Sequence, residues 1–179
     1  MKRRLFGFPD PVNEVAARTV AAGVLVMAVV ALAADLPWLL IPLAYGFWAR
    51  VLTGPTLSPL GQLATRVVAP ALPVAPRPTP GPPKRFAQGI GTAVTSAAVI
   101  VWATAGWGWA SILVGVLAVA AFLESAFGFC VGCRIFGLLM RAGVIPEEVC
   151  EACADINRRH RTPAAGPSAS RSASPSPVE

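Results

Sequence analysis

The chain has 179 residues, of which 55% are hydrophobic and 13% are charged, about half the roughly 25% charged share of an ordinary soluble domain. Its mean hydropathy of +0.62 means that the apolar residues exceed what one small core can hide, which excludes a typical soluble enzyme. The net charge of +6 in so apolar a chain favours membrane topology and contact with anionic lipid over nucleic-acid binding. The composition therefore predicts an all-α integral membrane protein that sits in a lipid bilayer and binds no nucleic acid.

Four apolar stretches are long enough, or nearly so, to cross the roughly 30 Å hydrocarbon core of a bilayer as helices. They pair into two transmembrane hairpins, which we expect over residues 15–52 and 88–129. A cleaved signal peptide ending near Ala33 is the alternative for the first stretch, but the long segment before it favours a retained hairpin. The four expected spans are residues 15–34, 36–52, 88–107 and 108–129.

The basic residues predict the orientation of these spans. Lys and Arg precede or open the first span, lie at or between the second and third, and follow the fourth. The two short turns, around Asp35 and around residues 106–108, carry none. By the positive-inside rule both termini and the middle loop are cytoplasmic.

The segments outside the spans differ in composition. Ser58 and Pro59 precede a run with one apolar face, which predicts either a short helix on the membrane surface or an extended loop that touches lipid. Residues 73–83 have the composition of a stiff polyproline-like spacer. The segments are an N-terminal cytoplasmic segment (1–14), a Pro-rich cytoplasmic loop (53–87), a cytoplasmic helical segment with four cysteines (130–161) and a disordered tail (162–179).

The four cysteines form two identical C-x-x-C pairs, Cys130 with Cys133 and Cys150 with Cys153. Their spacing lies in the range of a four-cysteine zinc site, so zinc is one candidate cofactor. The other interpretation is thiol redox chemistry, because a C-x-x-C at a helix start lowers the pKa of its first thiol. We expect Cys130 to be the nucleophile and Cys133 the resolving thiol. A cytoplasmic position argues against a permanent structural disulfide.

Glu124 is the only ionisable residue in the fourth span, and a carboxylate there is energetically expensive unless it has a partner. We expect a structural ion pair with Arg18 or Arg50, which lie at about the same depth in the first two spans. A catalytic role as a proton relay to Cys130 is a weaker hypothesis. It requires the helix to break at Gly128, since six residues at about 100° each place the two side chains about 120° apart.

Several short segments are similar to one known family. They run in the family's order over residues from about 9 to 140, and the Gly-Phe-Cys-x-Gly-Cys segment is the most distinctive of them. The chain resembles the bacterial membrane-protein family called domain of unknown function 4395. The segments are Asp10 to Asn13 with Arg18, Gly54 to Pro59, Lys84 to Gln88, and Phe122 to Glu124 leading to Gly128 to Cys133.

The resemblance implies an inner-membrane protein and favours thiol or sulfur chemistry. The family has no established activity, but its members are companions of thioredoxin-like proteins and sulfurtransferases in gene context. Its hallmark is the first cysteine pair, whereas Cys150 and Cys153 lie beyond the matched part. We therefore expect Cys130 and Cys133 to exchange thiol, disulfide or sulfane sulfur with a thioredoxin-like or sulfurtransferase partner. The alternative is a non-enzymatic membrane scaffold with a structural zinc site at all four cysteines.

Overall fold

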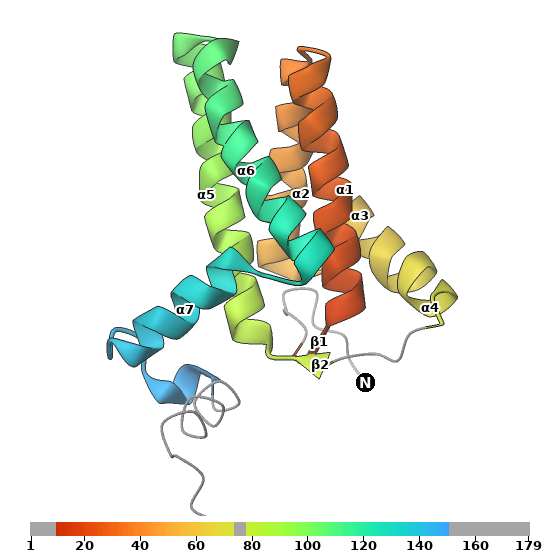
Figure 1. The fold of residues 1–179 in the computed structure, drawn as a ribbon, viewed down its shortest axis with the longest axis vertical. Helices are drawn as coiled ribbons and strands as arrows, with labels where there is room; N and C mark the ends of the chain where they lie inside the picture. Colours follow the sequence, from red (N-terminus) through yellow and green to blue (C-terminus); the bar gives the residue numbers. More distant parts are fainter. Residues whose placement is uncertain (1–9, 74–77, 151–179) are drawn as a thin grey trace, which may run out of the picture.

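The computed structural model describes residues 10–73 and 78–150, and helices dominate it (Figure 1). The expected tail over residues 162–179 and the greater part of the N-terminal segment lie outside these ranges. The four longest helices among the described residues are α1 (Glu14–Ala33), α2 (Leu40–Thr53), α5 (Gly81–Ala105) and α6 (Trp107–Phe127). The shorter elements are β1 (Val12–Asn13), η1 (Pro37–Leu39), α3 (Pro59–Leu63), η2 (Ala64–Val68), α4 (Ala69–Ala71), β2 (Pro78–Thr79), α7 (Val131–Arg141) and η3 (Glu147–Cys150).

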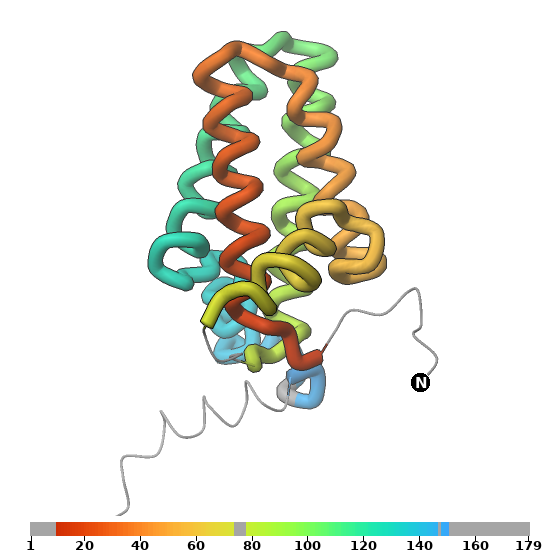
Figure 2. The backbone as a smooth tube through the Cα atoms, turned by 90° about the vertical axis from the view of Figure 1, so that its right-hand side faces the viewer, coloured from red at the N-terminus to blue at the C-terminus, as the bar shows by residue number. Residues whose placement is uncertain are grey.

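Helices α1, α2, α5 and α6 lie side by side (Figures 1 and 2). α1 packs mainly against α6, α2 against α5, and α5 against α6. The turn from α1 to α2 and the turn from α5 to α6 lie at one end of this bundle. The opposite end carries α3, α7 and the small sheet in which β1 pairs antiparallel with β2. The cysteine pair therefore lies at the end away from the two turns.

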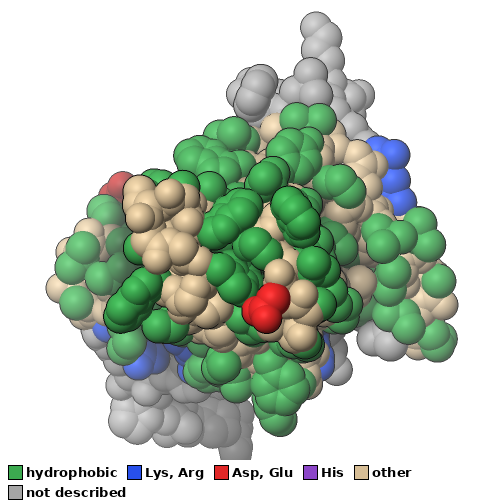
Figure 3. Space-filling model, turned by 90° about the horizontal axis from the view of Figure 1, so that it is seen from above, with side chains coloured by type: hydrophobic (Ala, Val, Ile, Leu, Met, Phe, Trp, Pro, Cys, Tyr) green, Lys and Arg blue, Asp and Glu red, His purple; other side chains and the backbone are tan. Residues whose placement is uncertain are grey.

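The surface of the bundle is apolar, as a lipid environment requires. Among the described residues, α1, α5 and α6 are each long and apolar enough to cross a membrane. Their outer faces expose large aliphatic side chains such as Val26, Ile100 and Val119. The face at the turn end is also largely hydrophobic (Figure 3). Because water would make these surfaces a strong aggregation hazard, the chain is a helical membrane protein.

Small residues let the helices of the bundle pack closely. Ala28, Ala98 and Ala110 are buried together with Leu40 and Val114 in one core cluster. A second cluster contains the ring of Phe47 on α2. Gly91 on α5 faces this ring so closely that an added Cβ would lie 2.2 Å from a ring carbon. Without a hydrophobic driving force between helices in lipid, such close contacts supply much of the attraction.

Helix α5 begins earlier than the sequence predicts. The expected span starts at residue 88, and the expected polyproline-like spacer extends to residue 83, whereas α5 starts at Gly81. Pro82 and Pro83 fit into its first turn, because helix N–H groups there have no intrahelical partner. Asp10 accepts a hydrogen bond from the backbone N–H of Gly81 (3.0 Å), which holds this helix start. The loop prediction for residues 81–87 is therefore wrong.

The segment after α2 is helical, as one of the two sequence interpretations predicts. Ser58 Oγ accepts a hydrogen bond from the N–H of Gly61 (3.2 Å) and caps α3. The helix continues through a π-helical turn at η2 into α4. Leu63 and Val67 remain exposed on it, and it leaves the bundle sideways near the end opposite the turns (Figure 1). A short amphipathic helix in this position is suited to lying on a membrane surface.

Candidate functional site

The chain breaks sharply between α6 and α7. Gly128 has a φ of +67°, a left-handed conformation that ends α6. Its N–H donates to the carbonyl of Glu124, and the N–H of Phe129 donates to that of Leu123. This is a glycine-based helix stop, for which a residue with a Cβ is poorly suited. The break required for Glu124 to approach Cys130 is therefore present.

The first cysteine pair occupies the start of α7. Cys130 is the N-cap residue of this helix, and Cys133 is the third residue within it. Both thiols are free. Cys130 is 8% exposed, whereas Cys133 is partly exposed. A thiol at this position lies close to the positive end of the helix dipole, which favours its ionised form.

The two thiols differ in acidity. A hydrogen bond from the Cys133 side chain lowers the pKa of Cys130. Burial and the charge of Glu124 act in the opposite direction, while Lys84 and the Cys133 backbone add to the lowering. The same hydrogen bond, together with burial, raises the pKa of Cys133 strongly. Cys130 is thus the thiol that ionises first, and Cys133 holds its proton.

Glu124 forms an ion pair with Lys84. The sequence does not predict Lys84 as its partner. Lys84 Nζ donates to Glu124 Oε1 at 2.6 Å, and both side chains are largely buried. The prediction of an ion pair with Arg18 or Arg50 is wrong. The reason is the early start of α5, which places Lys84 inside the bundle and opposite the last turns of α6.

The two arginines have other roles. Arg18 donates to the carbonyls of Ser125 and Ala126, two of the acceptors that the end of α6 leaves without helical partners. Arg50 donates through Nε to Gln88 and through Nη1 to Ser58. Arg50 still lies within electrostatic reach of Glu124. Both arginines therefore connect segments that are distant in sequence.

A cavity of about 810 Å³ opens beside the cysteine pair. Cys130 and Cys133 line it together with Lys84 and Arg134. The guanidinium of Arg134 lies over the ring of Phe129, 5.0 Å from its centroid. The cavity provides the route by which another molecule can reach the largely buried Cys130 sulfur.

Cys150 lies apart from the first cysteine pair. It is buried with Phe136 and Met140 towards the far end of α7, and it is disulfide-bonded. Cys153 lies outside the described residues. Within residues 10–73 and 78–150, no group of three or more His, Cys, Asp or Glu side chains is arranged to hold a metal ion. The structure therefore does not bring Cys130, Cys133 and Cys150 together as zinc ligands.

The disulfide at Cys150 differs from the expectation that no cysteine is held in a permanent disulfide. That expectation depended on a cytoplasmic, reducing compartment. The cellular compartment determines whether a disulfide persists. Whether two cysteines can form one depends on the distance between their sulfur atoms. Among the described cysteines, Cys130 and Cys133 are the two with free thiols.

The close approach of α7 to α5 depends on Gly132. A Cβ at this position would lie 2.6 Å from the Cα and the Cβ of Ala87. We expect Gly132→Ala to lower the free energy of unfolding by about 1–3 kcal/mol, because the start of α7 must move away from α5. Thermal unfolding in detergent, followed by tryptophan fluorescence, measures this loss.

Gly137→Ala is the matched control on the same helix. A Cβ at Gly137 would meet nothing within 4 Å, and alanine is the better helix former. This variant should unfold at the wild-type temperature or slightly above it. Equal unfolding temperatures for Gly132→Ala and the wild type would contradict the close packing of α7 on α5.

Sequence reasoning identified Cys130, Cys133 and Glu124 as candidates but missed Lys84. Lys84 contacts Glu124 and lines the cavity beside both thiols. The signal for it was present in the Pro82-Pro83 pair, which is compatible with the first turn of a helix. A helix start there places Lys84 within the helix and not in a loop.

Comparison with known proteins gives a family and no individual relative. No curated protein matches the chain, and no solved structure matches it. The sequence segments that resemble domain of unknown function 4395 lie within or next to the region that the family comparison identifies. A family model described as a domain of unknown function, DUF4395, matches residues 12–141, which is most of the chain, and the protein belongs to this family.

Proposed function

We propose that this protein crosses the bacterial inner membrane four times, as two helical hairpins. Helix α2 is the additional span. With η1 it is continuous over residues 37–53, which corresponds to a length of about 25 Å at roughly 1.5 Å per residue. It packs beside α5, and Ile41, Tyr45 and Trp48 are exposed along it. A span shorter than the hydrocarbon core is accommodated by local thinning of the bilayer.

The charges support an orientation with both termini in the cytoplasm. No Lys or Arg occurs in residues 19–49 or 86–133, which contain both turns of the bundle. By the positive-inside rule, the end with the cysteine pair then faces the cytoplasm. The Lys and Arg residues in the described ranges are Arg18, Arg50, Arg66, Lys84, Arg85, Arg134 and Arg141.

At this face, we propose, Cys130 and Cys133 exchange a disulfide or sulfane sulfur with a thioredoxin-like or sulfurtransferase partner. The observation that carries the proposal is the pair of free thiols at the start of α7, both of which line a cavity. The Cys130 thiolate attacks one sulfur of the partner's disulfide, a mixed disulfide forms, and the partner's second sulfur leaves as a thiolate that takes up a proton. The Cys133 thiol then loses its proton and attacks Cys130, which releases the partner's first sulfur.

The net change in this exchange is balanced. Cys130 and Cys133 are oxidised to a disulfide, and the partner's disulfide is reduced to a dithiol. The reverse sequence reduces the protein at the expense of the partner. With a persulfide donor, the same thiolate attacks the outer sulfur, takes it up, and leaves the donor as a thiol. Both reactions use Cys130 as the nucleophile.

Oxidation followed by alkylation tests this function. The full-length protein in nanodiscs is treated with increasing diamide, labelled with a maleimide, and analysed by peptide mass spectrometry. We expect Cys130 and Cys133 to lose their labelling together, with a mass lower by two hydrogens, and to recover it with reduced thioredoxin. A gain of one sulfur at Cys130 after incubation with a persulfide indicates the sulfur-transfer branch.

Two variants sharpen this test. Cys133→Ser should trap a mixed disulfide between Cys130 and an oxidised thioredoxin-like protein, because the resolving thiol is missing. Cys130→Ser should form no such adduct at Cys133, whose pKa is raised. If Cys130 and Cys133 remain alkylatable at every dose of oxidant, the proposal is wrong.

A further inference from the structure

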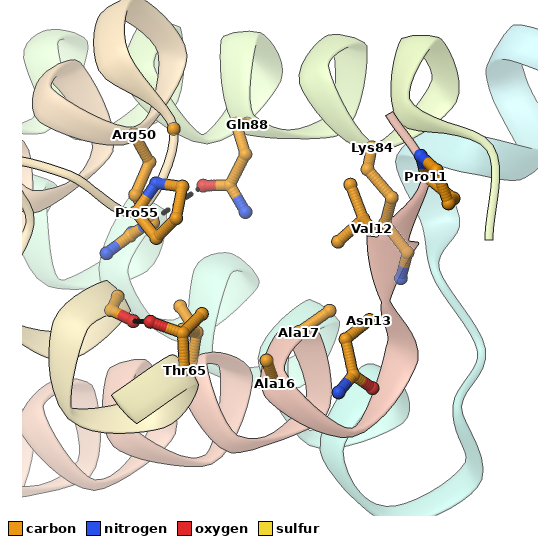
Figure 4. Close-up of a pocket in the computed structure, with 13 residues that line it drawn as sticks. Pro11, Val12, Asn13, Ala16, Ala17, Arg50, Pro55, Thr65, Lys84 and Gln88 are labelled. Atoms are coloured by element: carbon orange, nitrogen blue, oxygen red, sulfur yellow. Dashed lines mark hydrogen bonds between the residues drawn. The ribbon is translucent and has the colours of Figure 1, made fainter. Parts of the chain in front are cut away.

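A second cavity lies between α5 and α1, at the same end of the bundle as the cysteine pair (Figure 4). Its volume is about 180 Å³. Arg50 and Gln88 lie at one end of it and Lys84 at the other. Most of the remaining wall is apolar, from side chains that include Val12, Ala16 and Val20. The cavity is therefore an apolar space with cationic groups at its edge.

Arg50 lies in the wall of this cavity and is only 4% exposed. Its Nε donates to Gln88 Oε1 at 2.9 Å, and its Nη1 donates to Ser58 Oγ at 3.2 Å. Its guanidinium also lies over the ring of Phe47, 4.5 Å from the centroid. All these partners are electrically neutral. No Asp or Glu in the described part of the chain forms an ion pair with this buried guanidinium.

The two cations that line the cavity differ in their partners. Two cations, Arg50 and Lys84, line it, and the nearby carboxylate is that of Glu124, which is bonded to Lys84. The guanidinium of Arg50 is therefore charged without an ion-pair partner among the described residues, in a largely buried, apolar setting. A buried charge without a counter-charge is expensive, and neutral hydrogen-bond partners compensate it only in part. A bound anion at Arg50 would balance the charge.

We propose that this cavity binds a small organic monoanion, with its acidic group at Arg50 and its apolar body against α1. The single guanidinium in the cavity wall has no ion-pair partner among the described residues, which calls for one negative charge on the ligand. The apolar wall favours an organic body over an inorganic ion. The volume of the cavity limits the size of the ligand. A cavity of about 150 Å³ accommodates benzene, so the ligand is about as large as a short-chain or aromatic carboxylic acid.

The lining of the cavity also comes from distant parts of the chain. Segments that carry the family resemblance contribute Pro11 to Asn13, Gly54 with Pro55, and Lys84 with Gln88. Gly61 approaches Pro55 so closely that an added Cβ would lie 2.9 Å from its Cα. The segments around the cavity are thus tightly packed against each other, while a space remains between α5 and α1. A binding site accounts for this arrangement without reference to the cysteine chemistry.

Direct binding of hexanoate tests the proposal. The full-length protein in nanodiscs is dialysed to equilibrium against radiolabelled hexanoate, against hexanol of similar size, and against inorganic phosphate. We expect saturable binding of hexanoate, and binding at least tenfold weaker for hexanol and for phosphate. Hexanol that binds as well as hexanoate would show an apolar cavity without anion recognition and would overturn the proposal, as would phosphate that binds equally well.

Three variants locate the binding. Arg50→Gln should abolish saturable hexanoate binding, whereas Arg66→Gln, which removes an exposed positive charge, should leave it unchanged. Ala17→Leu fills the cavity and keeps Arg50, so it should weaken hexanoate binding at least tenfold. If Arg50→Gln does not fold, Ala17→Leu alone tests whether hexanoate binds in this cavity. Wild-type affinity in Ala17→Leu would overturn the proposal. None of these outcomes depends on whether Cys130 and Cys133 react.

Discussion

Glu124→Gln and Lys84→Met are each expected to lower the free energy of unfolding by about 3–5 kcal/mol. Each replacement leaves one charge largely buried without its partner, since Lys84 Nζ and Glu124 Oε1 form a 2.6 Å ion pair. The effect is large because water cannot easily replace the lost partner at this depth of the bundle.

The double variant Lys84→Met/Glu124→Gln separates the ion pair from other effects of the two substitutions. It removes both charges, so we expect it to recover most of the stability that either single variant loses. Thermal unfolding in detergent, followed by tryptophan fluorescence, measures all three, with Arg66→Gln as the control for loss of an exposed charge. Additive losses in the double variant would contradict a direct interaction between Lys84 and Glu124.

Cys133→Ala is expected to reduce the alkylation rate of Cys130 at neutral pH about tenfold or more. The alkylated species is the thiolate, and the hydrogen bond from the Cys133 side chain lowers the pKa of Cys130. Removal of that donor raises the pKa, so the rise of alkylation rate with pH moves to higher pH. Cys133→Ser keeps a hydroxyl donor and should lie between the alanine variant and the wild type.

The charges of Lys84 and Glu124 should move this profile in opposite directions. Lys84 lowers the pKa of Cys130 and Glu124 raises it. Lys84→Met therefore shifts the alkylation profile to higher pH, and Glu124→Gln shifts it to lower pH. Iodoacetamide kinetics from below neutral pH to above pH 9, read at the Cys130 peptide by mass spectrometry, give each curve. Shifts of the same sign in both variants would contradict the electrostatic arrangement of the site.

The helical content and the membrane character were predictable from the sequence alone. In lipid every backbone N–H and C=O must find a partner within the protein, which restricts spans to helices and closed barrels. Long continuous apolar runs favour helices, because barrel strands alternate apolar and polar residues. The start of the surface helix at Ser58 and the end of α6 at Gly128 were also readable locally. A serine N-cap and a glycine in the left-handed region depend on their immediate neighbours and not on tertiary contacts.

The partner of Glu124 shows where such reasoning fails. Arg18 and Arg50 are the partners that the sequence predicts, because they lie at about the same depth in the first two expected spans, whereas Lys84 falls in the expected loop over residues 53–87. In the structure α5 already begins at Gly81, held by Asp10 from a distant part of the chain. The resulting helix carries Lys84 to Glu124, while Arg18 and Arg50 find carbonyls and neutral side chains.

The sequence by itself determined the class of the protein, the positions of its four apolar stretches and the identity of the cysteine pairs, since these follow from composition and local spacing. Only the tertiary structure decided which charges meet, that Cys150 lies away from Cys130 and Cys133, and that a cavity lies beside Arg50. The physical reason is that apolar burial and helix capping act locally along the chain. Ion pairs and cavities depend on the rotation and depth of separate helices, which the packing of small residues sets.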